Sequence, residues 1–135
     1  MPDCRFCGID PALVVHETAE CLVFLDYRPV FPGHCLVIPK AHYPTVFDIA
    51  PEAMEAVARC TARVAIAVNR AVQPDGLNLI QANGAGAGQS VGHFHLHVFP
   101  RRLNDGVAIN WDPKPGDHAH IAEIAEIAAR IRALL

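Results

Sequence analysis

The sequence predicts an α+β fold, in which about five short strands form an antiparallel sheet beside a long central helix and a C-terminal helix. Most of the chain up to residue 100 consists of short segments rich in apolar and β-branched side chains, which are typical of strands. One long segment among them repeats its apolar residues at helical spacing. Strands and helices do not alternate regularly, so a parallel α/β sheet is not expected. No repeat or long polar linker divides the chain, and residues 1–135 are expected to form a single domain.

Three strands are expected ahead of the long helix, at 13–18 (LVVHET), 21–26 (CLVFLD) and 35–39 (CLVIP). Their β-branched and apolar side chains fit the pleated, half-buried surface of a sheet. The stretch 28–33 (RPVFPG) is rich in turn-forming residues and separates the second strand from the third.

The long helix is expected over 51–72. Pro51 suits the first helical position, and Glu52 and Glu55 favour the positive end of the helix dipole. Apolar or small residues recur at three- and four-residue spacing and so form one buried face. This face consists of Met54, Val57, Ala58, Thr61, Val64, Ala65 and Val68.

Two further strands are expected after the helix, at 77–81 (LNLIQ) and 93–100 (HFHLHVFP), joined by the glycine-rich stretch 83–89. Asp117 is a good N-cap for a final helix. The apolar stripe of that helix consists of Ile121, Ile124, Ala128, Ile131 and Leu135.

Composition and charge exclude several classes of function. The formal net charge of −3 leaves no basic stripe for a nucleic-acid polymer, although a nest of backbone N–H groups still suits a single phosphate. No apolar run approaches the ~20 residues that span a bilayer, and the N-terminus lacks the apolar core of a signal peptide. A cytoplasmic location without membrane contact is therefore expected. Disulfides are rare there, and Cys21, Cys35 and Cys60 lie in apolar stretches and are interpreted as core residues.

Three histidines, His93, His95 and His97, alternate with apolar residues along the last expected strand. Side chains two residues apart on a strand share a face, so the three imidazoles line one surface while the intervening side chains enter the core. Imidazole can serve as a nucleophile, a proton carrier near neutral pH or a metal ligand. A merely polar, solvated strand face is the alternative, but such faces usually carry Lys, Glu or Thr.

The stretch 86–92 (GAGQSVG) lies immediately before these histidines. Glycines let the backbone turn sharply and approach a ligand, and successive N–H groups form an anion-binding nest to which Gln89 and Ser90 can add donors. A plain hairpin connection is the alternative. The direct junction with the histidine strand favours a phosphate cradle beside a nucleophile.

Residues 88–101 (GQSVGHFHLHVFPR) resemble the signature of the histidine triad (HIT) family, which is His-x-His-x-His followed by apolar residues and preceded by Gly-Gln-(Ser/Thr)-Val. The resemblance extends to 24–26 (FLD) and 33–42 (GHCLVIPKAH). It implies that His95 attacks the α-phosphorus of a nucleotide and forms a nucleotidyl-histidine intermediate, which water then hydrolyses. A hydrogen bond from the other ring nitrogen of His95 to a backbone carbonyl would fix the neutral, nucleophilic tautomer. The resemblance also implies that His97, Gln89 and Ser90 hold the phosphate oxygens.

The same resemblance implies a site for an AMP-containing purine nucleotide. Asp26 would bind the ribose hydroxyls, although a solvated turn aspartate is the alternative. One departure is Ala82, which stands where many relatives carry a polar residue. The remaining substrate-binding residues implied are Phe6, Ile9, Phe24 and Tyr27 around the base, with His34, Asn83 and Gly88 near the phosphates.

Cys4-x-x-Cys7 has the spacing of a zinc knuckle, which needs two further ligands. The candidates are His42 and His93, and family members with this N-terminal motif usually bind zinc through the equivalent set. Structural Zn²⁺ is therefore expected on Cys4, Cys7, His42 and His93. A redox pair and unmetallated thiols are the alternatives, and no βαβ pattern surrounds the motif to favour the redox pair.

These features predict an enzyme, a nucleotide hydrolase or transferase that cleaves at the α-phosphate of adenosine phosphoramidates or dinucleoside polyphosphates. One alternative is a zinc-dependent hydrolase whose catalytic metal sits on His93, His95 and another histidine. A second is a nucleotide-binding regulatory module with incidental activity. The family resemblance also implies a homodimer, with the long helix and a strand edge at its interface.

Overall fold

The computed structural model describes residues 4–109 and 121–135. The described part of the chain divides into two compact units, one holding the sheet and its helix and the other holding the C-terminal helix. The elements, in chain order, are η1 Pro11–Leu13, β1 Val14–Glu17, β2 Cys21–Leu25, β3 Cys35–Pro39, α1 Pro51–Val72, β4 Gly76–Gln81, η2 Ala85–Ala87, β5 Leu96–Arg101 and α2 Ile121–Arg132.

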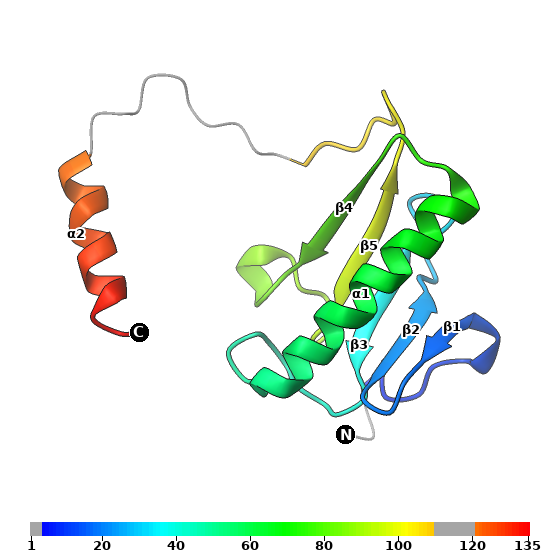
Figure 1. The fold of residues 1–135 in the computed structure, drawn as a ribbon, viewed down its shortest axis with the longest axis horizontal. Coiled ribbons are helices and arrows are strands. Elements are labelled where there is room, and N and C mark those ends of the chain that lie inside the picture. Colours follow the sequence, from blue (N-terminus) through cyan, green and yellow to red (C-terminus); the bar gives the residue numbers. More distant parts are fainter. Residues whose placement is uncertain (1–3, 110–120) are drawn as a thin grey trace. The chain divides into compact units, whose positions relative to one another are not determined.

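The strands form one five-stranded antiparallel sheet in the order β1-β2-β3-β5-β4, which confirms the predicted α+β class (Figure 1). β5 lies between β3 and β4, with Leu36 opposite His97 on one side and Ile80 opposite His97 on the other. The strand that carries the histidine motif is thus an interior strand with a neighbour on each side. Hydrogen bonds to β3 on one side and to β4 on the other therefore fix the backbone from which the side chains of β5 project.

Helix α1 crosses one face of the sheet and buries its apolar face there (Figure 1). It has the predicted bounds, Pro51 to Val72, and the next residue, Gln73, stops the helix with a left-handed φ of 47°. The cysteines interpreted as core residues are buried in this layer, and burial raises the pKa of the Cys35 thiol to about 11. The core between helix and sheet consists of Cys21, Val23, Cys35, Val37, Ala56, Val57, Cys60, Val64, Val68, Phe94 and Val98.

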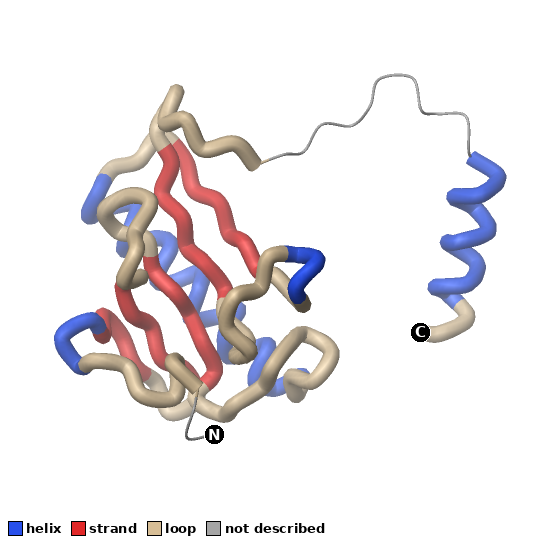
Figure 2. Tube along the Cα trace, turned by 180° about the vertical axis from the view of Figure 1, so that it is seen from behind, coloured by secondary structure: helices blue, strands red, loops and turns tan. Residues whose placement is uncertain are grey.

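The opposite face of the sheet is free of α1, as the view from behind shows (Figure 2). A smaller apolar cluster lies on this face, formed by Phe6, Phe24, Leu36 and Ile38. Phe6 comes from the segment before β1, so the N-terminal part of the chain contributes to this cluster. The histidine motif faces this side.

The main deviation from the expected elements is the start of β5 at Leu96, three residues later than predicted. Leu96 is the first residue of the strand in chain order, and it pairs with Val37 of β3 and with Gln81 of β4. Ahead of it the chain leaves the ladder, and the Phe94 N–H donates to the Tyr43 carbonyl at 2.6 Å. β1 is also shorter than expected, because Leu13 belongs to η1 and the strand ends at Glu17. Its register with β2 shifts between Val14 and His16.

The C-terminal unit contains α2, as expected, with Ile124, Ile127 and Ile131 exposed in it. The proposed N-cap Asp117 lies outside the described residues. Among the described helices, none is both long and apolar enough to cross a bilayer.

We predict that Gly33→Ala destabilises the protein by about 1–3 kcal/mol. Gly33 has a φ of +92°, and a Cβ there would lie 3.2 and 3.3 Å from the two methyl carbons of Val72 at the end of α1. The control is Gly86→Ala, where φ is not in the left-handed region and nothing lies within 4 Å of the added carbon. Urea denaturation should give the control a free energy of unfolding within about 0.5 kcal/mol of wild type. Equal losses in the two variants would contradict the proposed strain.

Candidate active site and metal centre

The histidine motif separates its side chains between the two faces of the sheet, as predicted from strand alternation. Phe94 and Val98 are fully buried in the core under α1, and Leu96 packs against it. His95 and His97 lie on the other side, with their ring centroids 5.0 Å apart. The alternation therefore holds even though His93 and His95 precede the paired part of β5.

His95 is oriented by its own backbone. Its Nδ1–H donates to the His93 carbonyl at 2.6 Å, which confirms the predicted hydrogen bond to a backbone carbonyl. In the neutral imidazole the other nitrogen, Nε2, then keeps its lone pair. The His95 residue is 4% exposed, and the edge-on ring of Phe6 lies 5.1 Å away. The ring is thus held in one tautomer and one orientation.

His97 belongs to a second group of side chains, with His34 and Asp26. His34 Nε2 lies 2.8 Å from His97 Nδ1 and 3.6 Å from Asp26 Oδ2. Because the Val30 N–H approaches His34 Nδ1 at 3.5 Å, we assign the proton of neutral His34 to Nε2, from which it is donated to His97. His97 then carries its own proton on Nε2.

Burial sets the charge of this group. Burial, together with the neighbouring His95 and His34, lowers the pKa of His97 to about 4, although Asp26 opposes the change. Burial also lowers the pKa of His34, although Asp26 opposes the change. Both imidazoles are therefore neutral at neutral pH. Separate roles were expected for these residues from the sequence. Only the sheet brings them together, since Asp26 follows β2, His34 precedes β3 and His97 lies in β5.

The glycine-rich loop is organised by Gln89. Its amide donates to the carbonyls of Pro44 at 2.7 Å and Val91 at 3.0 Å, and its Oε1 accepts from the Gly84 N–H at 2.7 Å. Gly88 has a φ of 80°, which a glycine adopts without strain. Ser90 follows with an exposed side chain. Gln89 thus holds together the loop in which phosphate binding was expected.

Asn83 also bonds within the protein. Its Oδ1 accepts from the Val46 N–H at 2.7 Å and from Gln81 Nε2 at 3.1 Å. The pair links the end of β4 to the segment after β3. Gln81 was not expected from the sequence to contribute, although a glutamine at the end of an apolar strand, two residues before Asn83, was a usable signal.

Of the four residues expected around the base of a nucleotide, three lie together in the structure and Tyr27 does not. Phe6 and Phe24 make an edge-to-face contact with ring centroids 5.3 Å apart, and Ile9 packs against the same cluster. Phe24 is fully buried, so Phe6 and Ile9 form the outer part of this cluster. Tyr27 is 53% exposed and lies outside it.

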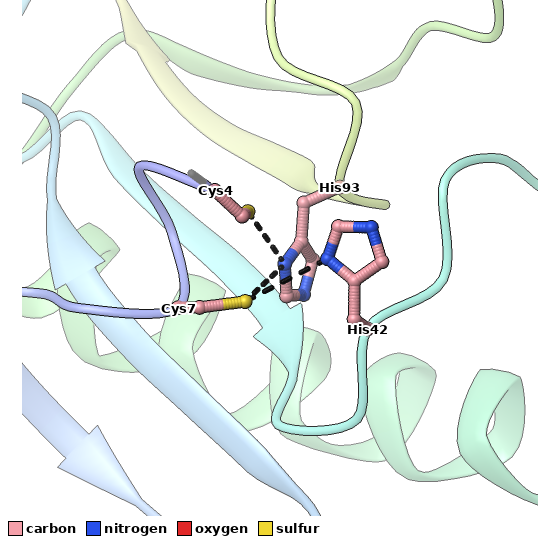
Figure 3. A group of neighbouring side chains, drawn as sticks. All are labelled: Cys4, Cys7, His42 and His93. Carbon is pink, nitrogen blue, oxygen red and sulfur yellow. Dashed lines mark hydrogen bonds between the residues drawn. The ribbon is translucent and has the colours of Figure 1, made fainter. Parts of the chain in front are cut away.

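Cys4, Cys7, His42 and His93 converge in a group that could hold a metal ion (Figure 3). His93 Nδ1 lies 3.5 Å from Cys4 Sγ and 3.7 Å from Cys7 Sγ, and Cys7 Sγ lies 3.6 Å from His42 Nδ1. A tetrahedral zinc with ordinary Zn–S and Zn–N bonds separates sulfur and nitrogen ligands by about 3.6 Å. The donor atoms therefore already have the spacing of such a site.

The buried imidazole of His93 has a second partner behind this group. Its Nε2–H donates to the Pro39 carbonyl at 2.9 Å, so Nδ1 keeps the lone pair that faces the thiols. Burial lowers the pKa of His93, which favours the neutral ligand form. A backbone acceptor behind a metal-binding histidine is the usual way to fix its tautomer and orientation. The residues thus fit a structural zinc.

Comparison with known proteins places this arrangement in a family. Residues 9–104 match the family model described as HIT domain. The chain is 37% identical to the Bacillus subtilis Protein hit, over 96% of this chain and 94% of that one. It is 32% identical to the Schizosaccharomyces pombe adenosine 5'-monophosphoramidase hnt1, over 96% of this chain and 98% of that one.

A third relative is longer. The chain is 39% identical to the Arabidopsis thaliana adenylylsulfatase HINT3 over 76% of this chain, and the match spans 54% of that protein. The chain thus covers about half the length of this relative but nearly the whole of the two above.

Solved structures agree with the sequence comparisons. A HIT family protein from Bacillus subtilis superposes with a TM-score of 0.90 at 34% identity, covering 98% of this chain and 97% of that one. A Zn-bound histidine triad family protein from Mycobacterium smegmatis superposes with a TM-score of 0.73 at 34% identity, covering 96% and 98%. With the family match over residues 9–104, these likenesses show that the chain belongs to the histidine triad (HIT) family.

Proposed function

We propose that this protein is a nucleotide hydrolase or transferase that cleaves AMP-containing substrates at the α-phosphate, with His95 as the nucleophile. The observation that carries the proposal is the 2.6 Å bond from His95 Nδ1–H to the His93 carbonyl, which leaves the Nε2 lone pair for attack. Two relatives are named for reactions of this class, an adenylylsulfatase and an adenosine 5'-monophosphoramidase.

The reaction has two displacements. His95 Nε2 attacks the α-phosphorus in line, the bond from phosphorus to the leaving group breaks, and a nucleotidyl-histidine forms. An anionic phosphate beside His97 raises the pKa of this ring in the complex, so that it binds a proton and passes it to the leaving group. Water then attacks the phosphorus, its proton goes to His97, and the phosphorus–nitrogen bond breaks to release AMP.

We propose subsites for the ribose, the base and the phosphates on the surrounding residues. Asp26 binds the ribose hydroxyls, and the purine packs at the cluster of Phe6 and Ile9 with Phe24 behind them. Ser90 and the backbone at Gly88 bind phosphate oxygens, in a loop that Gln89 holds in shape. His34, which contacts both Asp26 and His97, belongs to the same proposed site, to which we also assign Tyr27 and Asn83.

In this proposal zinc stabilises the fold and takes no part in the reaction. A zinc on Cys4, Cys7, His42 and His93 would supply a cross-link between the N-terminal segment, the chain after β3 and the segment that leads to His95. The geometry does not support the rival catalytic metal on His93 and His95. The Nδ1 of His95 is engaged by a backbone carbonyl, while that of His93 faces the thiols.

We further propose a cytoplasmic homodimer. β4 is an edge strand of the sheet, and Leu79 on it and Ile66 on α1 are each 55% exposed. An edge strand and an apolar helix face left uncovered are features of surfaces that pair. Reduced thiols in the cluster of Cys4 and Cys7 suit the cytosol.

We predict a covalent adduct on His95. Rapid quench with a substrate radiolabelled at the α-phosphate should give acid-labile label on the wild-type protein and none on His95→Asn, because asparagine lacks the nucleophilic nitrogen. The control is His16→Asn, which changes a histidine on β1 and should label as wild type. If His95→Asn still becomes labelled, His95 is not the nucleophile.

A second prediction concerns the ribose. Asp26→Ala should lower kcat/KM for a ribonucleotide substrate by about tenfold to a hundredfold, since charge-assisted hydrogen bonds contribute about 1.5–3 kcal/mol. The matched substrate is the 2′,3′-dideoxy analogue, for which the variant should behave almost as wild type. If both substrates lose the same factor, Asp26 has a structural part instead.

A third prediction separates the tasks of neighbouring histidines. His93→Ala should lose zinc and melt at a lower temperature, because structural zinc contributes directly to folding. Cys7→Ser should lose zinc in the same way without opening the core, since Cys7 is exposed. His95→Asn should keep about one zinc per chain and a near-normal Tm while losing turnover. The zinc content, Tm and kcat of the three variants show whether His93 and His95 have separate roles. Loss of zinc in His95→Asn would instead favour a catalytic metal bound to the triad histidines.

A further inference from the structure

The geometry points to a second metal site, distinct from the cysteine cluster, in which Asp26, His34 and His97 bind an exchangeable divalent transition-metal ion. Each residue offers one ligand atom, and the three atoms lie within 4.8 Å of one another. They come from neighbouring parts of the sheet, after β2, before β3 and within β5. The antiparallel pairing of these strands therefore builds the group.

Two imidazoles and one carboxylate form a well-known set of metal ligands. In proteins the 2-His-1-carboxylate combination binds iron or zinc and leaves coordination positions open to water or a substrate oxygen. The group contains no thiolate, so it differs in kind from the set of Cys4, Cys7, His42 and His93. Imidazole nitrogen favours Zn²⁺, Co²⁺, Ni²⁺ or Cu²⁺ over Mg²⁺ and Ca²⁺.

The ligand atoms are held in position before any metal binds. Asp26 Oδ1 accepts the Arg28 N–H at 2.8 Å, so Oδ2 is the oxygen that faces His34. The His34 ring packs against Phe99 with centroids 4.6 Å apart, and its side chain is 4% exposed. His97 is fixed by pairing with β3 and β4. Little conformational freedom is lost when a metal ion is bound.

The rearrangement that metal binding requires is small. His34 Nε2 and His97 Nδ1 are 2.8 Å apart, and two nitrogens on one tetrahedral zinc are about 3.3 Å apart, so the rings must separate by about half an ångström. The proton on His34 Nε2 leaves that atom or moves to Nδ1. The contact given up at Nδ1 is the 3.5 Å approach of the Val30 N–H, which is too long to be a strong hydrogen bond.

A regulatory consequence rests on the proposed function. Asp26 is the proposed ribose ligand and His97 the proposed partner of the phosphate, so the metal and the nucleotide use the same side chains. A bound ion would also occupy the His97 nitrogen that receives the proton from His34. Metal and nucleotide therefore exclude one another, and free transition-metal ion inhibits the enzyme by competition.

The test uses the full-length, zinc-loaded protein titrated with Co²⁺ by equilibrium dialysis and visible absorption spectroscopy. Wild type should take up one Co²⁺ beyond its resident zinc, with d–d absorption and no thiolate-to-metal charge-transfer band. Asp26→Asn and His97→Gln should each weaken this binding by about tenfold or more, since loss of a direct ligand exceeds loss of an outer-shell partner. The control is Glu55→Gln, which removes an exposed carboxylate on α1 whose ion-pair partner is Arg59 one helical turn away.

Circular dichroism melting shows that each variant is folded before it is titrated. Failure of the zinc-loaded wild type to bind Co²⁺, a thiolate charge-transfer band, or wild-type affinity in both folded variants would overturn the site. Saturating AMP should prevent Co²⁺ binding. If Co²⁺ binds as expected but AMP leaves its Kd unchanged, the metal site stands and the nucleotide roles proposed for Asp26 and His97 fail.

Discussion

The segment from His93 to His95 is held by three hydrogen bonds to main-chain carbonyls, and the organisation of the site depends on them. The Phe94 N–H donates to Tyr43, the His93 ring donates to Pro39, and the His95 ring donates to His93. These bonds replace the sheet ladder, which begins only at Leu96. They position the imidazoles of His93 and His95, for which we propose different tasks, on a stretch of backbone that precedes the paired part of β5.

Burial gives these imidazoles their chemical character. His34, His93 and His95 are all buried, and burial lowers the pKa of His34 and His93 and brings that of His97 to about 4. A buried polar group is costly unless it is hydrogen-bonded, and each of these rings has a partner on at least one nitrogen. Burial therefore favours the neutral form of His34, His93 and His97. The hydrogen bonds orient the rings of His93 and His95 in a way that suits metal ligation and nucleophilic attack.

Phe6 joins the cysteine cluster to the proposed catalytic residue. It stands between Cys4 and Cys7 in the sequence, and its ring packs edge-on against His95 and Phe24. The same short segment therefore supplies two of the candidate metal ligands and one wall of the site. His93 makes a second connection, because its ring faces the thiols while its carbonyl holds His95.

Local sequence determined the elements and the division of the histidine motif between two faces. Helix α1 and strand β3 have the predicted bounds, because proline, helical periodicity and β-branched runs act within a few residues. The alternation of Phe94, Leu96 and Val98 with the histidines likewise follows from the two-residue period of a strand. The convergence of Cys4 and Cys7 with His42 and His93 was expected from motif resemblance, and the donor spacings support it.

The tertiary structure alone decided which distant residues meet. The grouping of Asp26, His34 and His97 depends on the order β1-β2-β3-β5-β4, which no local pattern encodes. The bonds of Gln89 to Pro44 and of Asn83 to Val46 likewise join segments far apart in sequence. The late start of β5 also has a tertiary origin, because the Phe94 N–H donates to the distant Tyr43 carbonyl and not to a neighbouring strand. Side-chain periodicity is set by the covalent geometry of the chain, whereas partner choice is set by packing of the whole sheet.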